Sequence, residues 1–196
     1  MTEEARTGLS GRLQIWLVGL LFVAPLVIAV WLYYDGSLRP AGRSNHGALL
    51  EPVVNLQDVL PDSPAAELWQ DHWLLVYEHD GECGAQCRDA LYTLRQSRLM
   101  LGNDMHRLIR VFLHGELAPD RVFLDEFVAE HHAGLRVVRD EDFGRLLGTA
   151  RPEQLPAGGF FLVDPLGNLV MYFSPDLDPR DMVEDIQHLL DLSRIG

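Results

Sequence analysis

The chain has 196 residues and a formal charge of −13, and all sixteen of its basic residues are arginine. Such an acidic chain is a poor partner for nucleic acid, whose binding depends on many lysine and arginine contacts to phosphate. The absence of lysine excludes Schiff-base and P-loop lysine chemistry, and the length allows one ordinary domain beside a membrane segment.

The first predicted element is a transmembrane anchor at residues 13–34. Its central run, Ile15–Tyr34, contains no charged residue, and a helix of about 20 residues spans the hydrocarbon core of a bilayer. Trp16, Trp31 and Tyr33 lie near the ends of the run, where interfacial aromatic residues are common. A cleaved signal peptide is the alternative, but the run is longer than a usual signal core and ends in bulky aromatic residues.

The segments on either side of the anchor are predicted to be polar. Residues 1–12 are predicted to be a cytoplasmic N-terminus, and residues 35–49, rich in small and polar residues, a flexible linker. Two arginines precede the apolar run and two follow it, so the positive-inside rule does not decide the orientation. From the usual behaviour of an N-terminal anchor, we expect a single-pass protein of the bacterial inner membrane whose C-terminal domain faces the periplasm.

Residues 50–196 show the apolar periodicities of a domain with alternating strands and helices. Compact apolar runs are typical of strands buried on both faces, whereas apolar residues three or four apart indicate helices. The predicted elements are, in order, a strand and turn in Pro52–Leu60, a strand at Trp73–Tyr77, a helix from Cys87 to about Leu101, a strand at Arg107–His114, a helix from Asp120 to about Glu130, a strand at Leu135–Val138, a helix at Glu141–Leu147, hairpin strands at Gly159–Asp164 and Leu169–Phe173, and a last helix after Asp178.

The end of this domain carries the clearest local signals. A turn containing Pro165 and Gly167 separates two apolar runs and predicts a hairpin. Asp178 followed by Pro179 predicts the start of the last helix. The whole order predicts the α/β class with a thioredoxin-like fold, a mixed central sheet flanked by helices, behind an N-terminal transmembrane helix.

Cys83 and Cys87 are the only cysteines, and they lie between a predicted buried strand and the start of a helix. At a helix start, backbone N–H groups and the helix dipole stabilise a thiolate, the form that attacks disulfides and binds soft metals. A spacing of four predicts Cα atoms about 6 Å apart, which a disulfide accepts. A purely structural disulfide is the alternative, but so short a ring removes little entropy from the unfolded chain. The pair is predicted to be reactive or metal-binding.

A histidine near the thiols would complete a metal site. Two thiolates and one imidazole make a soft three-coordinate site suited to copper. His79, four residues before Cys83, is the candidate third ligand, and a solvated loop histidine is the alternative. His131 and His132 end a helix and are expected to be exposed there. Zinc is disfavoured because it usually takes four ligands and the chain has no second cysteine pair.

These residues resemble the Sco/SenC family, membrane-anchored thioredoxin-fold proteins that help to assemble the copper centre of cytochrome c oxidase. The resemblance is carried by the C-x-x-x-C pair after the run WLLVY, the segment Phe160–Phe173 and the closing amphipathic helix. In that family the two cysteines and a distal histidine hold copper. The position that matches this histidine is Pro156, and Gly84 and Arg88 replace the family's prolines beside the cysteines. The resemblance therefore implies a divergent member that lacks the distal ligand.

Pro156 also resembles the cis-proline that faces the thiols in ordinary thioredoxins, where it leaves a backbone edge free for substrate. On this resemblance Pro156 is predicted to bind substrate, and a plain loop proline is the alternative because few X-Pro bonds are cis.

Three functions remain open at this stage. The leading hypothesis is a Sco-like thiol-disulfide protein that serves oxidase assembly, in which Cys83 attacks a partner disulfide and Cys87 resolves the product. The second is a copper metallochaperone that uses Cys83, Cys87 and His79. The third is a non-catalytic factor that docks a respiratory oxidase subunit or another copper or thiol assembly protein. Copper is the cofactor that the resemblance implies.

Overall fold

The computed structural model describes residues 11–35, 45–193 and 195. The chain divides into two compact units, Met1–Ser44 and Asn45–Gly196. Most of the predicted cytoplasmic segment (1–12) and of the predicted linker (35–49) lies outside the described residues.

The described part of the first unit is one helix, α1 (Gly11–Asp35), which is 25 residues long and contains Pro25. Trp16, Phe22 and Trp31 are among its exposed apolar side chains. None of the helices in the described ranges meets the combined requirement of length and hydropathy for crossing a bilayer. The transmembrane anchor stays a prediction.

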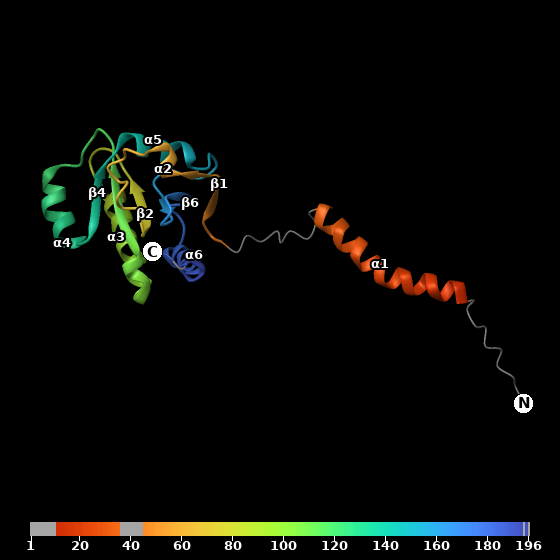
Figure 1. Ribbon diagram of the computed structural model, residues 1–196. Helices are drawn as coiled ribbons and strands as arrows, with labels where there is room; N and C mark the ends of the chain where they lie inside the picture. Colours follow the sequence, from red (N-terminus) through yellow and green to blue (C-terminus); the bar gives the residue numbers. More distant parts are fainter. Residues whose placement is uncertain (1–10, 36–44, 194, 196) are drawn as a thin grey trace, which may run out of the picture. The chain divides into compact units, whose positions relative to one another are not determined.

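The second unit is built around a six-stranded mixed sheet with the order β1-β6-β5-β2-β3-β4. Strand β2 pairs in parallel with β3, and β3 with β4, while β5, β6 and β1 add antiparallel neighbours on the other side of β2. The strands are β1 (Ala48–Asn55), β2 (Trp73–Glu78), β3 (Leu108–His114), β4 (Leu135–Arg139), β5 (Phe160–Val163) and β6 (Asn168–Phe173). The predicted thioredoxin-like layout, a mixed sheet flanked by helices, is confirmed (Figure 1).

Helical segments cover both faces of the sheet. They are α2 (Leu56–Val59), α3 (Ala85–Met100), η1 (Gly102–Arg107), η2 (Phe123–Val128), α4 (Ala129–His131), α5 (Glu141–Ala150) and α6 (Pro179–Leu192). Because side chains alternate along a strand, Trp73, Leu75 and Tyr77 pack with α3, η2 and α6. Leu74 and Val76 point to the opposite face and pack with α2 and α5.

Two helix starts follow the sequence prediction. The Asp178 side chain accepts a hydrogen bond from Arg180 N at the start of α6, as an N-cap residue does. The Asp120 carboxylate likewise accepts from Phe123 N at 2.7 Å. The helix after Asp120 is not a regular α-helix, however, because residues 123–128 are wound as a π-helix before α4 begins.

The first strand differs from its prediction. A strand and turn were expected in Pro52–Leu60, but β1 begins at Ala48 and ends at Asn55. Residues Leu56–Val59 form α2, since the Asn55 side chain accepts a hydrogen bond from Gln57 N and caps this short helix.

Candidate thiol site

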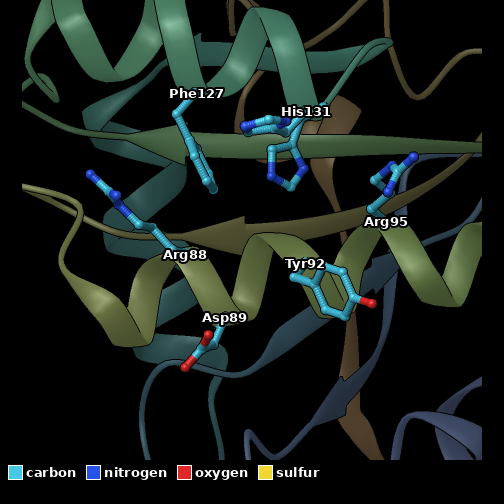
Figure 2. A pocket seen from close by; sticks show the side chains of 7 residues that line it. Arg88, Asp89, Tyr92, Arg95, Phe127 and His131 are labelled. Carbon is cyan, nitrogen blue, oxygen red and sulfur yellow. The ribbon is translucent and has the colours of Figure 1, made fainter.

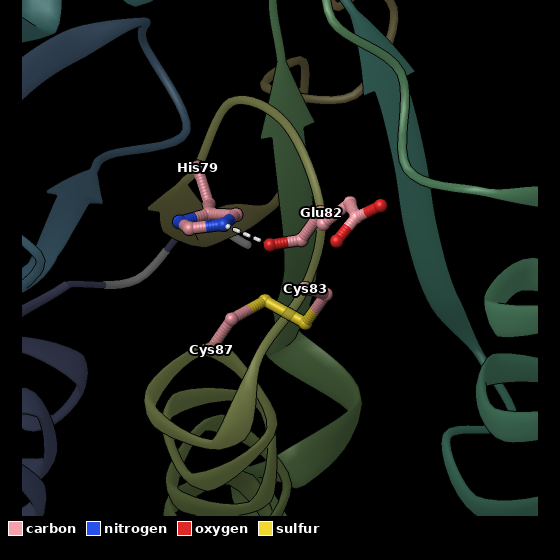
Figure 3. The surroundings of a disulfide bond; sticks show 4 residues. All are labelled: His79, Glu82, Cys83 and Cys87. Atoms are coloured by element: carbon pink, nitrogen blue, oxygen red, sulfur yellow. Dashed lines mark hydrogen bonds between the residues drawn. A yellow bond between two sulfur atoms is a disulfide. The ribbon is translucent and has the colours of Figure 1, made fainter.

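The cysteine pair lies where β2 passes into α3. Strand β2 ends at Glu78 and α3 begins at Ala85, so Cys83 lies in the connecting loop and Cys87 in the first turn of the helix. The two residues form a disulfide with a Cα–Cα distance of 5.2 Å (Figure 3). The predicted closeness of the two sulfurs is therefore confirmed.

The two sulfurs differ in their access to solvent. Cys87 is 1 % exposed and belongs to the core on the α3 side of the sheet, together with Leu91 and Phe160. Cys83 is only partly buried and packs against the edge of this core. Cys83 is therefore the more accessible of the two cysteines, while Cys87 is closed off from solvent.

The start of α3 favours an anionic sulfur. Gly84 is the N-cap residue and makes no side-chain capping hydrogen bond. The first N–H groups of the helix are therefore not taken by a capping side chain, and they point toward the region of the sulfurs. Such donors and the helix dipole stabilise a thiolate at this position.

Asp80 fixes the loop that carries Cys83. Its Oδ1 accepts hydrogen bonds from Gly115 N at 3.0 Å and Leu117 N at 3.2 Å, and Gly81 N donates to Leu117 O at 3.0 Å. Gly81 has φ +90°, a conformation that favours glycine. These bonds tie the cysteine loop to the segment after β3, so the loop is held from two sides.

His79 lies in this loop beside the disulfide (Figure 3). Its ring stacks on Tyr77 with a centroid distance of 6.2 Å. Its Nε2 lies 3.0 Å from Glu82 O, and because a carbonyl can only accept, Nε2 carries the proton in this bond. Nδ1 is then the nitrogen that a neutral imidazole would offer to a metal.

The donor set beside His79 fits copper only in the reduced protein. Neither sulfur of a disulfide is a thiolate, and the thiolate is the form that binds metal. Among the residues described, the one group of three potential ligands within 4.8 Å of one another is His46, Asp181 and Glu184, which contains none of the predicted ligands. The metal site at Cys83, Cys87 and His79 stays a prediction.

Carboxylates gather at the base of the loop. Burial raises the pKa of Glu78, the neighbouring Asp80 raises it further, and His79 partly offsets the shift. Burial, with a smaller effect of Glu78, raises the pKa of Tyr77 to about 12. The phenol at the end of β2 is therefore protonated at all physiological pH values.

Pro156 lies in the loop before β5, beside the start of α3. A Cβ atom placed on Gly158 of this loop would lie 3.9 Å from Gln86 Nε2. The Pro156 carbonyl accepts a hydrogen bond from the Tyr172 hydroxyl. The Leu155–Pro156 bond is trans, since the cis peptide bond of the described residues is Glu51–Pro52. The resemblance to the thioredoxin cis-proline is therefore wrong, whereas substrate binding by Pro156 stays a prediction.

A comparison with protein families identifies the domain. The family described as transmembrane-like, thioredoxin-like, C-terminal domain matches residues 73–193, which is more than half of the chain. The chain belongs to this family. The matched range begins at the first residue of β2 and includes both cysteines, the β5–β6 hairpin and α6. No curated protein matches the chain.

Solved structures of Sco proteins share the fold of this family member. Arabidopsis thaliana ScoI with copper bound is 15% identical, with a TM-score of 0.51 over 65% of this chain and 89% of that one. Yeast Sco1 is 18% identical, with a TM-score of 0.51 over 65% and 84%. Apo Sco1 from Thermus thermophilus is 17% identical, with a TM-score of 0.50 over 76% and 99%. The resemblance to Sco proteins is thereby confirmed for the fold.

Sequence reasoning missed two polar features of this family member. One is Asp80, whose carboxylate ties the cysteine loop to the segment after β3. The only local signal for this contact is an Asp-Gly pair typical of a turn. The other is Arg110, which lies within the apolar run of β3 and is only 3% exposed. His131 is exposed as expected, but His132 is 3% exposed, so its predicted exposure is wrong. Its ring packs against Phe127 at a centroid distance of 4.9 Å.

Proposed function

We propose that this chain is a membrane-anchored, Sco-like thiol-disulfide protein that exchanges disulfides with a copper-site partner during assembly of cytochrome c oxidase. The observation that carries the proposal is the pairing of Cys83 with Cys87 at a helix start, one cysteine partly exposed and the other buried. Such an arrangement separates the attacking thiol from the resolving thiol.

The exchange proceeds in two steps. In the reduced protein the Cys83 thiolate attacks one sulfur of a partner disulfide, forms a mixed disulfide and releases the partner's other sulfur as a thiolate. The Cys87 thiolate then attacks Cys83 Sγ, closes the intramolecular disulfide and releases the second partner thiolate. Two electrons pass to the partner, whose thiolates take up two protons from solvent to replace those lost by the cysteines. The reverse sequence oxidises a partner dithiol.

The small size of the ring closed by the disulfide favours a role in thiol chemistry over a role in stabilising the fold. The bonded cysteines are four positions apart in the sequence, and the loop-entropy relation gives a ring of this size about 2 kcal/mol of stabilisation. A link across 100 residues would contribute more than twice as much, about 4.7 kcal/mol. The domain also has an extensive apolar core on each face of its sheet. We therefore expect the domain to remain folded when this disulfide is reduced.

A redox and copper-binding experiment on the full-length protein tests the proposal. We expect reversible formation of the disulfide, exchange with a disulfide-bonded peptide and no retained copper after reduction and Cu(I) loading. The matched variant Cys83→Ser should lose exchange. Stoichiometric Cu(I) binding that disappears in Cys83→Ser would instead identify a copper carrier. Neither exchange nor copper binding would leave a docking factor.

Thiol labelling tests the proposed membrane topology. The only two cysteines of the chain lie in the C-terminal domain, so a labelled thiol reports the side of the membrane on which this domain lies. After mild reduction of intact spheroplasts, a membrane-impermeant maleimide should label Cys83. Labelling only after detergent lysis would place the domain in the cytoplasm. Extraction of the protein by carbonate would contradict the anchor.

A further inference from the structure

A cavity of about 210 Å³ lies beside α3, away from the loop that carries the thiols. Three arginines contribute to its wall, and they come from two different elements, α3 and β3. We name it the arginine cavity; it is lined by Arg95, Arg98, Leu99, Arg110, Glu130, His131 and Ala133.

Arg110 is the buried member of this cavity. It lies on β3 between Leu108 and Phe112, with its side chain on the α3 side of the sheet, and is 3% exposed. One guanidinium nitrogen, Nη2, donates to Ala133 O at 2.6 Å. The other two nitrogens, Nε and Nη1, have no acceptor among the described residues. Buried donors without acceptors are costly, and those of a charged group more so.

The charges of the cavity do not balance. Three guanidinium groups face a single carboxylate, that of Glu130. In the part of the chain that the structure describes, neither Arg95, Arg98 nor Arg110 lies within ion-pair distance of an acidic side chain. Burial, together with the smaller repulsion from Arg98 and Arg95, lowers the pKa of Arg110 to about 10. The three guanidinium groups and the one carboxylate leave an excess of two positive charges around the cavity, in a protein whose net charge is −13.

We propose that the arginine cavity binds the phosphate group of a phosphomonoester. A phosphate carries a charge close to −2 and three strong acceptor oxygens, so it would compensate the excess charge and accept hydrogen bonds from the guanidinium groups that line the cavity. The planar fork of arginine matches phosphate oxygens with paired hydrogen bonds. A single carboxylate would compensate only half of the excess charge. This site is independent of the proposed thiol exchange.

An adjoining groove of about 350 Å³ provides room for the rest of the ligand (Figure 2). It shares Arg95 and His131 with the cavity. Figure 2 shows Phe127 and His131 approaching the α3 side chains from the opposite wall, and the Arg88 guanidinium lies 5.1 Å from the centre of the Phe127 ring. An aromatic face and a guanidinium plane suit a flat or apolar organic group. Asp89, Tyr92 and His132 complete the lining.

His132, which lines this groove, also has a buried polar atom without a partner. It is 3% exposed, and its Nδ1 has no hydrogen-bond partner among the described residues. Burial, together with smaller effects of Arg110, Arg95 and His131, lowers the pKa of His132 to about 4. A bound dianion would oppose these positive neighbours, so the His132 ring reports on occupancy of the arginine cavity.

Titration of the full-length protein with inorganic phosphate, at constant ionic strength, tests the proposal. The His132 ring resonance, assigned with His132→Gln, should shift saturably, and the pKa of His132 should rise. Arg95→Gln changes an exposed residue and should weaken phosphate binding by tenfold or more. The matched control Arg145→Gln changes an exposed arginine of α5, on the other side of the sheet, and should leave binding unchanged. A shift that does not saturate, or equal effects of the two variants, would overturn the proposal.

The same measurement distinguishes a soluble phosphomonoester from a lipid headgroup. The protein is placed in nanodiscs of phosphatidylcholine alone or with one-fifth phosphatidic acid. If the source is soluble, phosphate binds equally in both. If it is a headgroup, phosphatidic acid shifts the His132 resonance before any phosphate is added, and Arg95→Gln reduces that shift. Both results support an oxyanion in the cavity, and the absence of any saturable shift in either nanodisc contradicts it.

Discussion

Replacement of Cys87 by serine should convert the protein into a trap for its partner. Cys83 remains accessible in this variant and still attacks a disulfide, but no second thiol resolves the product. The two cysteines have Cα atoms 5.2 Å apart, and an intramolecular thiol at such a distance acts at a high effective concentration. We therefore expect the mixed disulfide of Cys87→Ser with a disulfide-bonded peptide to last at least about 100 times longer than that of the unmodified chain.

Cys83→Ser is the matched control, because it removes the same five-residue ring and therefore the same stabilisation of about 2 kcal/mol. Its remaining thiol, Cys87, is 1% exposed and should form no adduct. Non-reducing electrophoresis and mass spectrometry count the adducts of each variant. Should Cys83→Ser form the lasting adduct and Cys87→Ser none, the roles of the two thiols would be reversed. Adducts with neither variant would contradict thiol exchange.

Gly159→Ala should destabilise the domain more strongly than any other small substitution near the site. A Cβ atom at this position would overlap the backbone oxygen of Phe173 and lie 2.6 Å from the Tyr172 hydroxyl oxygen. Phe173 is paired with Phe160 across the β5–β6 ladder, so relief of the overlap requires these two central strands to separate. We expect a loss of more than about 3 kcal/mol in the free energy of unfolding.

Gly148→Ala is the control for this substitution. Gly148 lies inside α5, and nothing lies within 4 Å of a Cβ atom placed there, so alanine should stabilise by about 0.5 to 1 kcal/mol. Urea unfolding, followed by tryptophan fluorescence, measures both variants. Equal stability of Gly159→Ala and the unmodified chain would show that the close approach of residues 159 and 173 is absent in solution.

Gly159→Ala should also affect the loop beside the thiols. Gly159 N donates to the Tyr172 hydroxyl at 3.0 Å, and this hydroxyl donates in turn to the Pro156 carbonyl. The single glycine therefore connects the hairpin to the predicted substrate loop.

The sheet could be predicted from sequence where its strands are buried on both faces. Strand β5 and residues Trp73–Tyr77 of β2 are uninterrupted apolar runs, and every residue in them is buried. β1 could not be placed because it lies at the edge of the sheet, pairs only with β6 and has just one fully buried residue, Leu50. An edge strand of this kind carries neither an apolar run nor a clear alternation.

The candidate thiol site could be predicted because its two members lie close together in the sequence. Contacts between distant segments could not be predicted, because no local signal marks Gly115 and Leu117 as partners of Asp80. No local signal fixes the trans bond before Pro156 either. The arginine cavity also combines separate segments. Its one local signal is Arg110, a charged residue that interrupts an otherwise apolar strand.

The π-helical turn at Phe123–Val128 sets the direction of the side chains in α4, the short helix that follows it. Ala129 N donates to Leu124 O, five residues earlier, and the chain returns to α-helical bonding where His132 N donates to Val128 O. Such a turn accommodates one residue more than an α-helical turn. Deletion of a single residue within it would restore regular winding and rotate His131 and His132 by roughly 100° about the helix axis. The one additional residue in the π-helical turn therefore directs His131 and His132 toward α3.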